Sequence, residues 1–140
     1  MKNYDVYQFD GPGYQKLFHH QDWRISILNY IEELELDQIS YVESHKYTDE
    51  AFILLEGSCM MFFAEVQDDK IVSFSALNLE KNKVYNIHTG TFHTHTLSLD
   101  AKLLIIEEEN TCDSNSPRIP LNPEHRFMLK KLYLEKINEL

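Results

Sequence analysis

Short strands separated by turns, at intervals of about ten residues, fill the middle of this chain. Residues 24–30 alternate polar and apolar side chains, a pattern that gives a strand one wet face and one buried face. Further runs rich in β-branched and aromatic residues follow between turns: 39–45, 51–55, 59–66, 71–79, 84–88, 92–99 and 102–108. This rhythm predicts a sandwich or barrel of antiparallel strands over about residues 23–109.

A helix is expected after the barrel. Residues 114–121 contain two prolines and no periodicity. Asn122 then offers an N-cap, and Pro123 suits the first helical position. We expect a helix over about residues 123–139, packed on the outside of the barrel or on a partner subunit. Its apolar side would consist of Phe127, Leu132, Leu134, Ile137 and Leu140.

Composition narrows the class of protein. The 140 residues are enough for one domain, and 43% hydrophobic with 26% charged residues is typical of a globular chain. A net charge of −10 would repel phosphate backbones, which argues against nucleic acid as a partner. We find no apolar run of membrane-spanning length and no signal peptide. Cys59 and Cys112 lack metal or redox spacing, so we expect free thiols and a cytoplasmic location.

Several histidines and carboxylates are spaced so that they could converge. Alternate residues on a strand share a face, so Glu43 and His45 should point the same way, as should His93 and His95. Glu50 opens the next strand after a short polar turn and could fold back beside the first pair. Histidine is the commonest protein ligand of first-row metals. We therefore expect these side chains to meet around one point inside the barrel.

The spacing of the first group follows a known motif. One residue separates Glu43 from His45, four more precede Glu50, and another six precede Gly57. The pattern resembles the first motif of the cupin superfamily, in which a His-x-His pair is followed by a carboxylate and then a glycine. Here Glu43 replaces the first histidine of that pair.

The second group resembles the second cupin motif, Pro-x-Gly-x-x-His followed by Asn. Gly90 and His93 match the glycine and the histidine, whereas His88 and Leu97 replace the proline and the asparagine. The resemblance covers about residues 39–109 and is to a small single-domain cupin. It implies an all-β, antiparallel double-stranded β-helix, or jelly-roll barrel, with the C-terminal helix outside.

The resemblance also implies a metal site and its ligands. The family's ligand positions fall on Glu43, His45, Glu50 and His93. Two histidines and two carboxylates suit manganese, iron, nickel or zinc. His88 and His95 would be additional ligands, hydrogen-bond donors to the ligands, or general acid and base groups in catalysis.

Three functions remain open at this point. The first is a cupin that binds a divalent metal in the barrel mouth and acts, as an isomerase or oxygenase, on a small polar metabolite. The second is a module that binds a ligand, or senses it, without turnover. The third is a metal-free enzyme similar to the small-cupin ketoisomerases and epimerases of sugar nucleotides, although Glu43 occupies a position where those enzymes favour histidine.

A second copy of the chain is the expected protein partner. Ala51, Ile53 and Leu55 alternate against Phe52 and Leu54, so both faces of this strand are apolar. One of these apolar faces would point outward and be exposed to water in a monomer, which predicts a homodimer.

Overall fold

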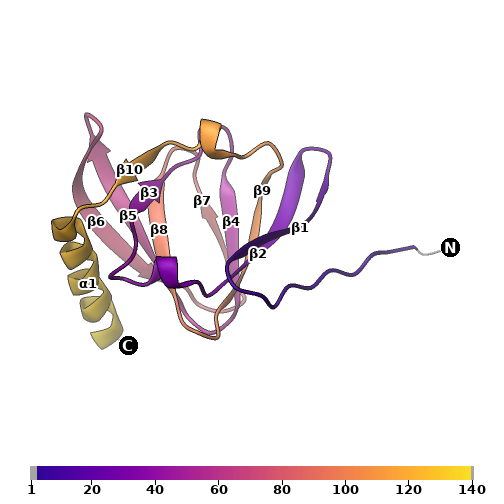
Figure 1. The fold of residues 1–140 in the computed structure, drawn as a ribbon, viewed down its shortest axis with the longest axis horizontal. Helices are drawn as coiled ribbons and strands as arrows, with labels where there is room; N and C mark the ends of the chain where they lie inside the picture. Colours follow the sequence, from indigo (N-terminus) through magenta and orange to yellow (C-terminus); the bar gives the residue numbers. More distant parts are fainter. Residues whose placement is uncertain (1–2, 140) are drawn as a thin grey trace.

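The computed structural model describes residues 3–139, which form two curled five-stranded sheets and a C-terminal helix (Figure 1). The first sheet has the order β1-β2-β9-β4-β7 and the second β10-β3-β8-β5-β6, with all paired strands antiparallel. The all-β jelly-roll barrel predicted from the sequence is confirmed. The strands are β1 (Tyr14–His20), β2 (Trp23–Asn29), β3 (Tyr41–Glu43), β4 (Glu50–Glu56), β5 (Cys59–Gln67), β6 (Lys70–Asn78), β7 (Val84–Ile87), β8 (Phe92–Leu97), β9 (Lys102–Glu108) and β10 (Arg118–Pro120).

The interior of the barrel is built by side-chain alternation. Along β9, every second residue is buried, and Leu103 and Ile105 point into the core beside Phe52 and Leu54 of β4. Met61 of β5 meets them from the second sheet and is fully buried. These apolar side chains fill the part of the barrel below the site, so the polar inward side chains are confined to the other end.

Helix α1 (Pro123–Asn138) begins as the sequence predicts. The Asn122 side chain accepts a hydrogen bond from the backbone N–H of His125 at 2.8 Å, and Pro123 occupies the first helical turn. The helix packs along the outside of the second sheet, next to β6. No helix among residues 3–139 is long and apolar enough to span a bilayer.

The face that α1 buries differs from the expected one. Leu129 is fully buried, and Leu132 and Tyr133 pack beside it on a separate apolar cluster outside the barrel. Phe127 and Leu134 are instead exposed, 68% and 54% of their surface respectively. Ile137 is also exposed, at 37%. The expected apolar side was wrong at these three positions because the helix turns the Leu129 side toward the sheet. Leu140, also assigned to that side, lies outside the described residues.

Two strands lie outside the range expected for the barrel. Strand β1 forms a hairpin with β2 at one edge, and β10 pairs with β3 at the edge of the other sheet. Strand β1 has no buried residue, so it lacks the alternation that identifies a half-buried strand. Strand β10 ends in Pro120, and proline in a sheet is mostly confined to edge strands.

Candidate functional site

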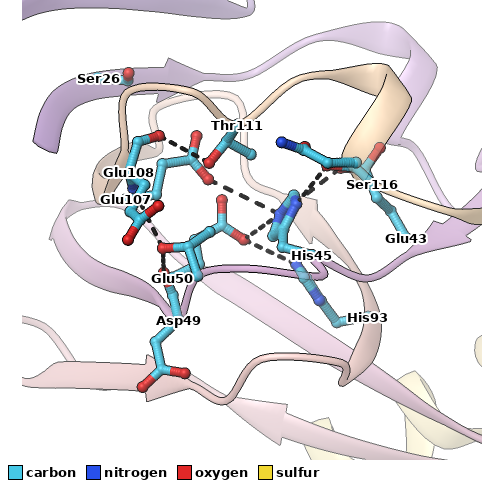
Figure 2. Close-up of polar contacts among 12 residues, drawn as sticks. Ser26, Glu43, His45, Asp49, Glu50, His93, Glu107, Glu108, Thr111 and Ser116 are labelled. Atoms are coloured by element: carbon cyan, nitrogen blue, oxygen red, sulfur yellow. Dashed lines mark hydrogen bonds and ion pairs between the residues drawn. The ribbon is translucent and has the colours of Figure 1, made fainter. Parts of the chain in front are cut away.

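Three buried side chains from both cupin-like motifs meet inside the barrel (Figure 2). His45 lies just beyond β3, Glu50 is the first residue of β4, and His93 lies in β8. Their exposed fractions are 7%, 7% and 6%. Because β4 belongs to the first sheet and β8 to the second, the group joins the two sheets at one end of the barrel.

The loops that carry these residues are held together. Asp49 accepts hydrogen bonds from the Asn86 side chain at 2.9 Å and from the backbone N–H of Thr89 at 2.8 Å. These bonds, that of Asn86 first, lower the pKa of Asp49 to about 2. The backbone N–H of Gly90 donates to the carbonyl of His45 at 2.9 Å. The loop before β4 is thus fixed against the loop before β8.

Both imidazoles point at one carboxylate oxygen. Nε2 of His45 lies 3.1 Å, and Nε2 of His93 3.0 Å, from Oε1 of Glu50. The three potential ligand atoms lie within 4.8 Å of one another. Ligands ~2.1 Å from a shared ion would lie ~3.0–3.4 Å apart, so these contacts are compatible with a metal ion as well as with hydrogen bonds.

The Nδ1 atoms of both imidazoles are also hydrogen-bonded, and the bond of His93 shows which of its ring nitrogens carries the proton. Nδ1 of His93 lies 2.9 Å from the carbonyl oxygen of Thr91, which only accepts, so Nδ1 carries a proton. A neutral His93 then directs the lone pair of Nε2 at the lone pairs of Glu50. That contact is repulsive unless a cation lies between the two atoms, either a proton or a metal ion. Nδ1 of His45 is hydrogen-bonded to the hydroxyl of Ser116 at 2.8 Å.

The charges of the group support an ionised Glu50. Burial works to raise the pKa of Glu50, but hydrogen bonds from His45 and His93 outweigh it and hold the pKa well below its usual range. Burial also works to lower the pKa of His45, whereas the hydrogen bond to Glu50 and the nearby carboxylates raise it above the ordinary value. Glu50 is therefore a buried negative charge that favours a cation beside it, either a proton on the imidazoles or a metal ion.

Glu107 of β9 lines the same cavity next to the group of three, although it is not part of that group, and the sequence reasoning missed it. Its side chain is 4% exposed, and Oε2 lies 3.8 Å from Nε2 of His45. Oε1 accepts a hydrogen bond from Arg24 of β2 at 2.6 Å. Burial, followed by the negative charge of Glu50, raises the pKa of Glu107 to about 7. Alternation along residues 102–108 was the available signal, because it places Glu107 on the same face as the buried leucine and isoleucine of that strand.

Glu43, the predicted fourth ligand, lies beside the group of three and is not part of it. Its Oε2 accepts a hydrogen bond from Nε of Arg118 at 2.8 Å, and its Oε1 lies 3.9 Å from Nε2 of His45. A quarter of the Glu43 side chain is exposed. The residue is thus at the rim, already paired with a cation.

The two predicted catalytic histidines lie in different places. His95 lines the central cavity, with its ring 5.8 Å from that of Phe52 and with Nδ1 buried and without a partner among residues 3–139. Burial, with a smaller contribution from His93, lowers the pKa of His95 to about 4. His88 is exposed and does not line this cavity.

The cavity in front of the group has a volume of about 450 Å³, which is enough for a small metabolite. Its wall combines the site residues with further polar groups from several strands: Tyr14, Arg24, Tyr41 and Arg118. The Tyr14 hydroxyl is hydrogen-bonded to that of Ser26 at 2.6 Å. Such a mixture of charge and aromatic surface is typical of a ligand site and unusual for a filled core.

Comparisons with known proteins identify the fold. No protein-family model and no curated protein matches the sequence. The structure is similar to that of a cupin-2 domain containing protein from Shewanella frigidimarina NCIMB 400, with a TM-score of 0.51 and 20% identity over 72% of this chain and 85% of that one. The chain has the fold of a small cupin. The resemblance seen in the motifs is confirmed at the level of fold.

Other cupin-fold structures extend over more of the chain. Streptomyces PAC13, determined with uridine, has a TM-score of 0.58 and 7% identity over 89% of this chain and 96% of that one. The capsular polysaccharide assembling protein CapF of Staphylococcus aureus has a TM-score of 0.55 and 15% identity, covering 83% of this chain and 32% of its own. At these identities the similarity concerns the fold alone.

Proposed function

We propose that this small cupin binds a divalent transition metal through His45, Glu50 and His93 and acts as an enzyme on a small polar metabolite. One observation carries the proposal. Nε2 of His93 faces Oε1 of Glu50 at 3.0 Å while its Nδ1 is occupied by the carbonyl of Thr91. A divalent ion between the two atoms would turn a lone-pair repulsion into two bonds.

The donor set and the cavity support this function. Two histidines and one carboxylate suit iron(II) with open positions for other ligands, and also manganese, nickel or zinc. When bound, such an ion would supply Lewis acidity to a substrate oxygen. Arg24 and Arg118 on the wall are each already paired with a carboxylate, so the wall offers a polar substrate hydrogen-bonding groups without an excess of positive charge, and the neutral imidazole of His95 lines the same cavity.

Metal analysis of protein purified without a histidine tag tests the proposal. We expect close to one ion per chain after loading, and loss of the ion in both His93→Ala and Glu50→Ala. His88→Ala removes an exposed histidine outside the cavity and should leave the metal content unchanged. A wild-type protein that cannot be loaded, or His93→Ala protein that still holds the ion, would contradict the proposed site.

A metal-free enzyme is the second candidate. A proton on Nε2 of His93 would satisfy the contact to Glu50 as well as a metal would, and the neighbouring Glu107 and Arg24 add a carboxylate and a cation to the same wall. Such a group could transfer protons during an isomerisation or elimination. Chelator treatment separates the two candidates, because turnover of a cavity ligand would persist without metal only in the second.

We also infer that the chain acts as one domain and pairs with a second copy. Leu104, Ile53 and Val84 are neighbours on adjacent strands of the first sheet and point outward, and Val84 is 66% exposed. Residues 3–12 follow an extended path towards the N-terminus (Figure 1). The carbonyls of Phe9 and Gly11 accept hydrogen bonds from Asn29 of β2, whereas Tyr4 and Val6 further out are 72% and 80% exposed. An apolar sheet face and an apolar arm on one molecule suit exchange of arms between two copies.

Sedimentation analysis tests this pairing. Ile53→Lys should convert a dimer to a monomer, because it places a charge in the middle of the outward face. Val72→Lys, at an exposed position of the other sheet, is the matched control and should stay dimeric. A wild-type protein that sediments as a monomer at micromolar concentration would refute the pairing.

A further inference from the structure

One carboxylate oxygen of Glu107, next to the proposed metal ligands, has an unusual environment. Oε2 is buried and has no hydrogen-bond partner among residues 3–139. It lies 3.8 Å from Nε2 of His45, the same atom that contacts Glu50. Besides burial, the negative charge of Glu50 and a hydrogen bond that the protonated carboxyl makes to that residue raise the pKa of Glu107. Two buried carboxyl groups this close need a cation between them, either a shared proton or a metal ion.

The strand register explains why Glu107 lies there. In β9 it pairs directly with Arg24 of β2. On its other side, Ala51 of β4 pairs with Ile106, so Glu50 is the neighbour of Glu107 across the sheet. The inward face therefore carries Arg24, Glu107 and Glu50 in a row, and Glu107 is placed between the cation and the proposed metal ligand.

Glu43 is the natural comparison, because the family resemblance assigns it the fourth ligand position. Its Oε1 is 3.9 Å from Nε2 of His45, nearly the same distance as Oε2 of Glu107. Each of the two carboxylates also has one oxygen bonded to an arginine. The difference is burial: the Glu43 side chain is 25% exposed and water can reach it, whereas that of Glu107 is 4% exposed.

We propose that Glu107, through Oε2, is the second carboxylate ligand of the metal, and that Glu43 is not a ligand. This inference rests on the proposed function of His45, Glu50 and His93. Arg24 is the positioning residue, because its bond to Oε1 at 2.6 Å fixes the carboxylate and leaves only Oε2 for the ion. The resulting set of two imidazoles and two carboxylates is neutral with a divalent ion, and its oxygen donors suit manganese(II) or iron(II).

Titration with manganese(II), followed by calorimetry, tests the assignment with two matched variants. Glu107→Gln and Glu43→Gln each replace a carboxyl group at almost the same distance from His45. Because Glu107 is buried and Glu43 is a quarter exposed, their electrostatic effects on the ion differ, so the ligand set is also read from a spectrum. The amide oxygen of glutamine can still accept the hydrogen bond from Arg24 or Arg118. We expect Glu107→Gln to weaken manganese binding at least about tenfold more than Glu43→Gln does. Equal weakening by both variants, or stronger weakening by Glu43→Gln, would overturn the assignment.

Two further measurements distinguish loss of a metal ligand from an indirect effect of the substitution. Glu107→Asp keeps the charge but withdraws the carboxylate, so it should also weaken binding if Oε2 is a ligand. The visible absorption of the cobalt(II)-loaded protein reports the ligand set directly. It should change in Glu107→Gln and Glu107→Asp but stay that of the wild type in Glu43→Gln. A cobalt spectrum unaffected by either Glu107 variant would overturn the assignment.

The same experiment separates this inference from the function on which it rests. If the wild type binds no divalent ion, the proposed function itself fails. If His93→Ala abolishes binding while Glu107→Gln retains the affinity and spectrum of the wild type, the three-residue site stands and the assignment of Glu107 is refuted.

Discussion

His95 should make the protein lose stability in acid more steeply than its other histidines do. Its imidazole lines the cavity with Nδ1 buried and unpartnered among residues 3–139, against the ring of Phe52. Burial lowers its pKa from an ordinary 6.5 to about 4, so the folded chain keeps this ring neutral where the unfolded chain protonates it. Stability is then unaffected by His95 above the unfolded pKa and is lost as the pH falls from 6.5 towards 4.

The size of this loss follows from the shift. One unit of pKa corresponds to about 1.36 kcal/mol, so the full effect of His95 approaches roughly 3 kcal/mol below both pKa values. Between about pH 7.5 and about pH 4.5 the contribution is roughly 2–3 kcal/mol. That is a large part of the 5–15 kcal/mol by which domains of this kind are usually stable.

Urea unfolding of the metal-free protein, with chelator present, measures the effect. The free energy of unfolding of the wild type should fall between these two pH values by roughly 2–3 kcal/mol more than that of His95→Gln, which has no titrating ring. His88→Gln is the matched control, because His88 is exposed in the folded chain, and it should follow the wild type. If His95→Gln loses as much stability as the wild type over this interval, burial does not hold His95 neutral.

Three further predictions concern a tight turn, the packing of the helix and the accessibility of the two cysteines. Gly57→Ala should destabilise the protein by about 1–3 kcal/mol in urea unfolding, because Gly57 has φ +72° and an added Cβ would meet the backbone of Ala101 at 2.6 Å; a change within error would contradict this close approach. Leu129→Ala should cost about 2–5 kcal/mol in the same measurement, since Leu129 is the fully buried residue by which α1 packs on the second sheet, whereas Leu134→Ala on the exposed side should cost much less. A thiol reagent should label one cysteine of the native protein, the exposed Cys112, and leave the buried Cys59 unreacted. The reason is that burial raises the pKa of Cys59 to about 12. Rapid labelling of both cysteines would show that the core is open to the reagent.

The parts of the fold that the sequence predicted are those with a buried face. Strands β4, β5 and β9 contribute to the core, so their side chains had to be apolar at inward positions, and the pattern was visible. Strands β1 and β10 pair only along one edge and bury little. Their formation depends on the strand beside them more than on their own residues, so local patterning did not reveal them.

The residues of the candidate site fall into the same two groups, those predictable from local sequence and those placed by pairing with a distant strand. The spacing of His45, Glu50 and His93 in two local motifs was sufficient to predict that they meet, because each motif is a turn beside a strand end. Glu107 comes close to Glu50 only through the pairing of β9 with β4, which are about fifty residues apart in the chain. Its inward direction was readable from alternation, but its neighbours were set by a long-range register.

The position of Glu43 beside the group of three has one identifiable cause. The parity argument placed Glu43 and His45 on one face because it assumed a strand through residue 45. Strand β3 ends at Glu43, so the alternation does not continue to His45. Glu43 is instead paired in register with Arg118 of β10, and the arginine binds its carboxylate. The strand that the sequence did not reveal is therefore what holds the predicted ligand at the rim, and it leaves the inward position near His45 to the carboxylate of β9.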